Sequence, residues 1–344
     1  MRSMRIGLLT AGGDCPGLNA VIRGVVLKGT RLHDHEFMGV RGGWRGLVED
    51  DIELLTRHQI RGLSKQGGTI LGTSRVGPYG EGNGGAARVK ETMARHGLDA
   101  LVAIGGDGTL TVARMLHEEG VPVVGVPKTI DNDLAATDVT FGFDTAVQIA
   151  TEAIDRLRTT GDSHQRCMVV EVMGRHAGWI ALHAGIAGGA HAILVPEVPL
   201  RWEQVADWAQ QTADRGRAPL VVVAEGFTPE GGEEVTTGGV DGFGRPLLGG
   251  IGVQAAANLQ ELTGIETRCT TLGHLQRGGS PSAYDRVLAT RFGTAALDAV
   301  HEHDYGQMVA LRGTEVVRVP LAEATMQTKA VPREQWEEAA ILFG

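Results

Sequence analysis

The feature that most constrains the fold of this chain is a repeated sequence pattern. A short apolar run ends at glycine or another turn residue, and a segment with helical spacing often follows. Residues 19–32, 109–119 and 145–157 place apolar side chains on one helix face. Apolar strands that alternate with helices are typical of parallel sheets buried on both faces, so the pattern predicts a doubly wound α/β fold. The expected strands are Ile6–Thr10, Ala100–Ile104, Val121–Val126, Met168–Val172, Ala192–Val195, Leu220–Ala224 and Cys269–Leu272.

Length and charge exclude several classes of protein. The 344 residues suit two domains, and the net charge of -9 argues against a nucleic-acid partner. No window holds 18 apolar residues, so we expect no membrane partner, and the first apolar stretch is too short for a signal peptide. Cys15, Cys167 and Cys269 lie far apart without Cys-x-x-Cys spacing, which indicates reduced thiols. We expect a cytoplasmic protein.

Two glycine clusters at strand ends indicate phosphate binding. The chain has 51 glycines, about twice the average usage. Gly12 and Gly13 follow the first strand, and Gly105–Thr109 follows a later one. Ligands of such sheets bind beyond the carboxyl ends of the strands, where backbone N–H groups can face a phosphate. Asp107 is placed to hold Mg²⁺ on phosphate oxygens, or else to cap the next helix.

The most specific segment is Pro127–Asp133. Asp131 and Asp133 are separated by one residue and lie beside Thr129 and Lys128. This arrangement fits a general base and a metal-linked acid around a transferring phosphoryl group. The alternative is an ordinary solvated acidic loop.

These motifs, in this order, resemble the 6-phosphofructokinase family over nearly the whole chain. The resemblance implies a fold of two Rossmann-like domains with mainly parallel sheets. We place a donor-binding domain at residues 1–142 and 276–326, and a fructose 6-phosphate domain at 143–275 and 327–344. Further matches to the family are Arg75, Arg166, Met173, Gly174, Arg175, Glu225, Arg268, His274 and Arg277.

The resemblance also implies a mechanism. Asp131 accepts the proton of the sugar 1-hydroxyl as that oxygen attacks the phosphoryl group. Arg75 and Arg175 neutralise the charge that develops, and Thr129 donates a hydrogen bond nearby. Asp107 and Asp133 hold Mg²⁺.

The same resemblance assigns the substrate contacts and the assembly. Met173, Gly174 and Glu225 bind the sugar. Arg166, Arg268, His274 and Arg277 hold its 6-phosphate. In the family Arg166 and Arg268 come from a neighbouring subunit, so we expect a homo-oligomer, commonly a tetramer.

The identity of the phosphoryl donor depends on two positions. Gly12, Gly13, Arg75, Gly106, Asp107, Gly108, Thr109 and Lys128 are the expected donor-binding residues. Gly108 resembles ATP-using members, since pyrophosphate users typically carry Asp there. Lys128 resembles the pyrophosphate users. A carboxylate at position 108 would repel the α-phosphate of ATP, whereas a lysine helps either donor, so we expect ATP and keep pyrophosphate as the alternative.

The sequence also departs from the family pattern at two regulatory positions and at one position near the phosphoryl donor. Arg23 matches an arginine of the family's effector site, but Leu27 stands where another arginine is expected, and His191 replaces a metal-binding glutamate. We therefore expect weak or absent activation by ADP. After Arg75 the family often has a second arginine, and this chain has the loop 77–85 instead.

Three other readings of the sequence are weaker. A lipid or NAD kinase shares the Gly-Gly-Asp-Gly-Thr segment but predicts no sugar-phosphate clamp. A non-catalytic binding protein would have lost Asp107, Asp131 or Asp133. A nicotinamide site at Gly80, Gly82 and Gly85 lacks the strand that should precede it. The histidine pairs at 33/35 and 301/303 are expected to be solvated loop or helix-end residues and not metal ligands.

Overall fold

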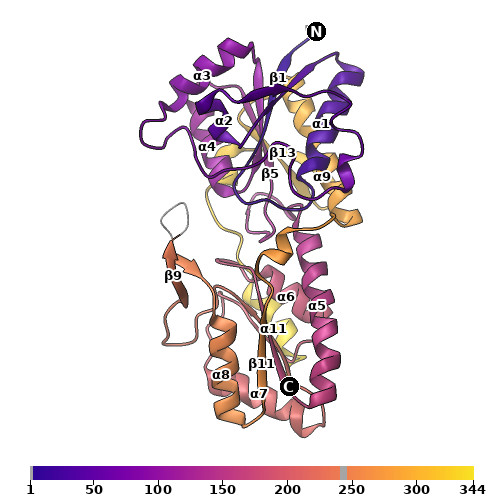
Figure 1. Ribbon diagram of the computed structural model, residues 1–344, viewed down its shortest axis with the longest axis vertical. Helices are drawn as coiled ribbons and strands as arrows, with labels where there is room; N and C mark the ends of the chain where they lie inside the picture. Colours follow the sequence, from indigo (N-terminus) through magenta and orange to yellow (C-terminus); the bar gives the residue numbers. More distant parts are fainter. Residues whose placement is uncertain (1–2, 241–245) are drawn as a thin grey trace. The chain divides into compact units, whose positions relative to one another are not determined.

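The computed structural model describes residues 3–240 and 246–344. The chain divides into two compact units, each with its own main sheet (Figure 1). Unit 1 contains Met1–Ile130, Leu134–Asp144 and Arg277–Gln327, and unit 2 contains Asp131–Asp133, Thr145–Gln276 and Thr328–Gly344. The predicted fold class, α/β with mainly parallel sheets, is confirmed. The roles of the two predicted domains stay predictions.

Unit 1 is built on a seven-stranded sheet in the order β13-β12-β5-β4-β1-β2-β3. The inner strands pair in parallel, and the edge strands β3 and β13 pair antiparallel. Every residue of β4 is buried, as expected for a strand covered on both faces. The strands are β1 (Arg5–Ala11), β2 (Glu36–Val40), β3 (Ile52–Leu54), β4 (Ala100–Gly105), β5 (Val123–Pro127), β12 (Gln307–Arg312) and β13 (Glu315–Pro320).

Helices cover both faces of this sheet. Helices α1 and α9 pack together on one side, with α2, α3 and α4 on the other (Figure 1). The apolar side chains of α1 lie on its buried face, which accounts for the amphipathic spacing of this segment. The helices are α1 (Leu18–Leu32), α2 (Trp44–Glu49), α3 (Gly85–His96), α4 (Asp107–Glu118), α9 (Ala283–His301) and α10 (Leu321–Ala324), with a short 3₁₀ turn at Leu63–Lys65.

Unit 2 contains a parallel four-stranded sheet in the order β11-β6-β8-β7. A separate antiparallel pair is formed by β9 and β10. The strands are β6 (Cys167–Val172), β7 (Ala192–Leu194), β8 (Leu220–Ala224), β9 (Thr236–Val240), β10 (Pro246–Leu248) and β11 (Thr267–Thr271). The helices are α5 (Phe143–His164), α6 (Trp179–Ala187), α7 (Trp202–Asp214), α8 (Ile251–Thr263) and α11 (Arg333–Ala340), and a 3₁₀ turn spans Gly273–Arg277.

Within the described residues, no helix combines the length and apolar character needed to cross a membrane. The three cysteines form no disulfide. Burial raises the pKa of the Cys15 and Cys167 thiols to about 12 and that of Cys269 to about 11. The thiols are therefore protonated at neutral pH.

His33 and His301 lie at helix ends, as the sequence predicted, whereas His35 is buried. His35 is only 3% exposed, and its Nδ1 accepts a hydrogen bond from the Met4 N–H at 3.1 Å. Its Nε2 lies 3.1 Å from Nδ1 of His301, whose ring stacks on His33 with the centroids 3.8 Å apart. Because Nδ1 of His35 is an acceptor, the proton of the neutral ring lies on Nε2 and is donated to His301.

This histidine cluster should make the protein sensitive to acid. Burial, followed by the neighbouring imidazoles, lowers the pKa of His35, and burial also lowers that of His301. A group with a lowered folded-state pKa takes up protons on unfolding, so its stabilisation is complete above about pH 6.5 and is lost as the pH falls below it. We expect the urea midpoint of the native protein to drop between about pH 7.5 and 5.5.

The matched variants are His301→Gln in the cluster and His58→Gln at an exposed position. The drop in midpoint should be smaller in His301→Gln and unchanged in His58→Gln. Equal drops in all three proteins would show that the cluster does not set the acid sensitivity.

Candidate active-site loops in the two units

The glycine loop after β1 gathers several of the predicted donor-binding residues. The Gly12 N–H donates to the Ser74 carbonyl at 3.2 Å, and the Thr73 hydroxyl donates to the Gly12 carbonyl at 2.5 Å. Nζ of Lys128 donates to the Gly13 carbonyl. Lys128 is 3% exposed, so its ammonium is held inside the unit at the edge of this loop. Arg75 follows directly after Ser74 and is exposed.

Arg277 also belongs to this group. A Cβ on Gly13 would lie 2.7 Å from Nη1 of Arg277, so a larger residue at position 13 would displace the guanidinium from the backbone. The same Nη1 donates to the Asp14 carbonyl at 3.2 Å. The neighbours of Arg277 in unit 1 are therefore the glycine loop, while its assignment to the sugar 6-phosphate stays a prediction.

The second glycine turn joins β4 to α4. A Cβ on Gly105 would lie 2.3 Å from Oγ1 of Thr109, and the Lys128 N–H donates to the Gly105 carbonyl at 2.9 Å. Helix α4 is capped by Gly106 and begins at Asp107, so the alternative reading of Asp107 as the helix cap is wrong. Asp107 and Gly108 are exposed at the helix start, where N–H groups and the helix dipole favour an anion.

Thr129 lies next to Lys128 at the end of β5. Its carbonyl accepts a hydrogen bond from the Thr140 hydroxyl at 2.7 Å, and Lys128 forms a parallel bridge with Phe141. The end of this strand is thereby fixed in unit 1.

In unit 2, backbone hydrogen bonds join the loop after β6 to the loop after β8. The Glu225 N–H donates to the Val172 carbonyl at 2.9 Å, and the Gly226 N–H donates to the Gly174 carbonyl at 3.1 Å. A Cβ on Gly226 would lie 1.9 Å from the Arg175 carbonyl oxygen. The predicted sugar-binding residues Met173, Gly174, Arg175 and Glu225 are therefore brought together.

A buried glutamine that sequence reasoning passed over extends this group. The Met173 N–H donates to Oε1 of Gln276 at 3.3 Å, and Nε2 of Gln276 donates to the Gly273 carbonyl at 3.0 Å. Gln276 is fully buried, and it ties the turn that carries His274 to the loop after β6. The available signal was a polar residue between predicted phosphate ligands, in the run His274–Gly279.

The turn that carries Asp131 and Asp133 also belongs to unit 2. Its middle residue, Asn132, is 4% exposed and has a φ of 52°. Asparagine tolerates this left-handed conformation better than most residues. The turn thus has a defined backbone conformation, with Asp131 and Asp133 partly exposed on either side of Asn132 in the sequence.

Two predicted phosphate ligands lie away from these loops. Arg166 precedes β6 and Arg268 is near the start of β11, where the register pairs Arg268 with Met168. Both guanidinium groups contact Glu266, and the pair Arg166 Nε–Glu266 Oε2 measures 2.8 Å. The hydrogen bond from Arg166 holds the pKa of Glu266 below its usual range. Arg175 and Glu225 follow the opposite ends of the strands, about 20 Å farther along at the rise of a parallel strand.

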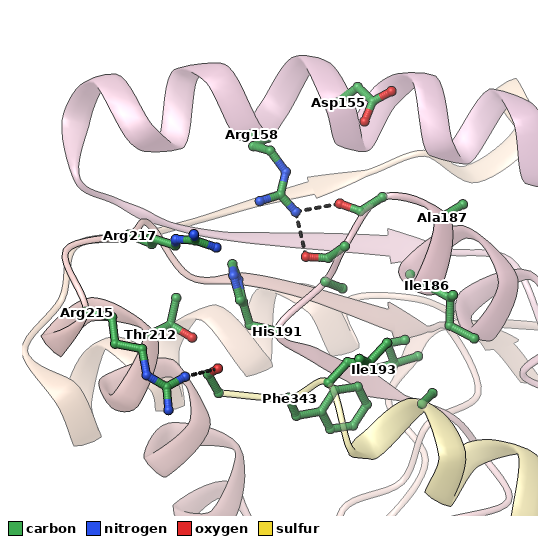
Figure 2. A pocket seen from close by; sticks show the side chains of 17 residues that line it. Asp155, Arg158, Ile186, Ala187, His191, Ile193, Thr212, Arg215, Arg217 and Phe343 are labelled. Carbon is green, nitrogen blue, oxygen red and sulfur yellow. Dashed lines mark hydrogen bonds between the residues drawn. The ribbon is translucent and has the colours of Figure 1, made fainter.

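Unit 2 also contains a pocket of about 800 Å³ (Figure 2). Its lining includes Arg158, Arg215, Arg217 and His191, of which only His191 was singled out from the sequence. Arg158 donates to the carbonyls of Gly188 and Gly189, and Arg215 donates to that of Gly344. The available signal was the pair of arginines flanking Gly216.

His191 lies in this pocket as a neutral imidazole. Burial, followed by Arg158, lowers the pKa of His191. Its Nδ1 accepts a hydrogen bond from the Leu220 N–H at 3.0 Å, which leaves only Nε2 for the proton. Arg23 and Leu27, the other residues of the regulatory comparison, lie on α1 in unit 1.

Comparisons with known proteins identify the family. Residues 5–300 match the family described as Phosphofructokinase. The chain is 60% identical to the pyrophosphate–fructose 6-phosphate 1-phosphotransferase of Amycolatopsis methanolica, over 99% of this chain and 100% of that protein. It is 52% identical to the ATP-dependent 6-phosphofructokinase 3 of Streptomyces coelicolor, over 98% of this chain and 99% of that protein.

A solved structure agrees with these matches. The Pichia pastoris phosphofructokinase, in the T-state, superimposes with a TM-score of 0.83 at 32% identity. The match covers 99% of this chain and 36% of that longer one. Because these matches extend over most of its length, the chain belongs to the phosphofructokinase family.

Proposed function

We propose that this protein is a 6-phosphofructokinase that transfers the γ-phosphoryl group of ATP to the 1-hydroxyl of fructose 6-phosphate. The observation that carries the proposal is the glycine loop of unit 1, where Lys128 and Arg277 bring two positive charges to backbone that can approach phosphates closely. The names of two relatives, a fructose 6-phosphate 1-phosphotransferase and a 6-phosphofructokinase, support fructose 6-phosphate as the phosphoryl acceptor. We expect the reaction to take place in the cytoplasm as a step of glycolysis.

The chemistry follows from the predicted roles of these residues. Asp131 takes the proton of the 1-hydroxyl, while Arg75 and Arg175 balance the charge on the transferred group, with Thr129 as a donor. Met173, Gly174 and Glu225 orient the sugar. Transfer of a phosphoryl group needs little covalent help, so positioning and charge supply most of the acceleration.

Mg²⁺ suits Asp107 and Asp133. Carboxylate oxygens are the hard ligands that this ion prefers, and Asp107 is exposed at the start of α4. Among the described residues, no three His, Cys, Asp or Glu side chains form a ready metal site. Mg²⁺ is commonly held by one or two carboxylates together with substrate phosphates, so we expect it to bind with the donor. When bound, it neutralises charge on the donor phosphates.

The choice of ATP rests on Gly108. The exposed start of α4 carries no second carboxylate there, so no fixed negative charge opposes the α-phosphate of a nucleotide. Pyrophosphate is the second candidate, and two observations favour it. The ammonium of Lys128 lies at the Gly13 carbonyl, and the 60%-identical relative is named for pyrophosphate.

Two parallel assays distinguish the donors. The purified protein is given fructose 6-phosphate and Mg²⁺ with ATP in one tube and pyrophosphate in the other, and fructose 1,6-bisphosphate is measured. We expect product with ATP. Product with pyrophosphate alone would show that Lys128 outweighs Gly108, and product with neither would return the lipid and NAD kinase readings to consideration.

The role of Asp131 is tested by Asp131→Asn. We expect kcat to fall by about 10²- to 10⁴-fold, the usual contribution of a general base, with little change in the binding of fructose 6-phosphate. Asp34→Asn, an exposed change of the same kind, should leave kcat unchanged. Near-native turnover of the Asp131 variant would refute its role as the base.

We infer that the active form is a homo-oligomer, most simply a tetramer. The positions of Arg166 and Arg268 beside Glu266, away from Arg175 and Glu225, support this inference. Side chains at that end of the sheet can serve the 6-phosphate site of a second copy, together with that copy's His274 and Arg277.

We expect ADP to activate the enzyme weakly or not at all. In the 800 Å³ pocket, His191 offers an uncharged nitrogen in place of a carboxylate, and nucleotide-bound Mg²⁺ prefers oxygen ligands. Arg158 and Arg215 already donate to backbone carbonyls there. The measurement is the initial rate at subsaturating fructose 6-phosphate with and without ADP, and a clear activation would contradict the expectation.

A further inference from the structure

A short segment near the end of the chain, Thr328–Val331, holds the turn that contains Asp131. The backbone N–H of Lys329 donates to the Asp133 carbonyl at 2.8 Å, and its Nζ donates to Oδ1 of Asn132 at 2.9 Å. Asn132 is buried between the two carboxylates in a left-handed conformation that depends on its surroundings. Both the main chain and the side chain of Lys329 therefore fix this turn.

The same lysine contacts the start of α6. Nε1 of Trp179 donates to the Lys329 carbonyl at 2.8 Å, and Nζ of Lys329 lies 5.6 Å from the centroid of the Trp179 ring. An ammonium at this distance from an indole is attracted to its face. Trp179 is 8% exposed, so the contact is shielded from water.

A carboxylate secures the other end of the segment. Oε1 of Glu197 accepts from the Val331 N–H at 2.7 Å and from the Gly178 N–H at 3.0 Å. Gly178 caps α6 and closes the loop that begins at Met173 and contains Arg175. The segment 328–331 thus joins the turn 131–133 to the end of the loop that carries Arg175.

We propose that Lys329 is a positioning residue for phosphoryl transfer, keeping the turn of Asp131 in register with the loop of Arg175. The inference rests on the proposed function. Lys329 acts through Asn132 and Trp179 and needs no contact with substrate. A small misplacement of a reacting group costs rate far more than it costs binding of the sugar, which has other contacts.

Lys329→Met tests this role, because methionine keeps an unbranched apolar stem and removes Nζ. We expect kcat to fall by about 10- to 100-fold and KM for fructose 6-phosphate to change by less than about threefold. Lys329→Arg keeps a cationic donor and should recover most of the rate. Lys90→Met is the matched control, since Nζ of Lys90 also donates to a carbonyl, that of Glu119, but at an exposed position. Its kcat should equal that of the native protein.

A role in stability alone is distinguished by thermal unfolding measured beside the kinetics. A folded Lys329→Met protein with native kcat overturns the proposal, whatever its unfolding temperature. If this variant does not fold, Trp179→Phe decides, because it removes only the indole N–H and the larger ring. We expect its kcat to fall by about 3- to 10-fold, and native kcat in this variant also overturns the proposal.

The outcome for the native protein separates this inference from the proposed function. Native protein that forms no fructose 1,6-bisphosphate with either donor refutes the proposed function. Active native protein whose rate does not respond to Lys329 or Trp179 refutes the inference alone.

Discussion

The loops that carry the proposed reacting groups depend on direct contact between main chains at glycine. At Gly226 the contact is closest, because a Cβ there would lie 1.9 Å from the Arg175 carbonyl oxygen. No relaxation of a flexible side chain could relieve such an overlap, since the opposing atom is backbone. This contact therefore holds the loops after β6 and β8 together, and it fixes the positions of the predicted sugar-binding residues that they carry.

Two cationic side chains meet at the glycine loop of a chain whose net charge is -9. The ammonium of Lys128 and the guanidinium of Arg277 both contact the main chain of the glycine loop. The loop is therefore suited to bind a polyanion, whose negative charge these two cations would complement.

Most of the fold was predictable from the sequence because its strands are long, apolar and buried on both faces. All seven expected strands are present, and they differ from the observed ones only at their ends. Six of the described strands were not predicted: β2, β3, β9, β10, β12 and β13. Of these, β3 and β10 are only three residues long, and β13 is only partly buried. Their pairing is decided by neighbouring strands and leaves little trace in local sequence.

The site was predictable only where residues lie in a recognisable motif. Asp131, Arg175 and Glu225 each follow a strand that the sequence reveals. Lys329 had no such signal, because a single lysine near the end of the chain acquires its contacts through the tertiary fold. The burial of His35 was not predicted for the same reason, since His35 and His301, which are 266 positions apart, meet only after folding.

The burial of Cys15 has a consequence for chemical reactivity. This thiol lies beside the glycine loop, and a pKa of about 12 leaves roughly one molecule in 10⁵ as thiolate at neutral pH. Peroxides and alkylating agents attack the thiolate, so the folded enzyme should resist inactivation at this cysteine. Slow labelling of Cys15 would then act as a clock for the opening of the loop, with the protein's own sulfur as the reporter.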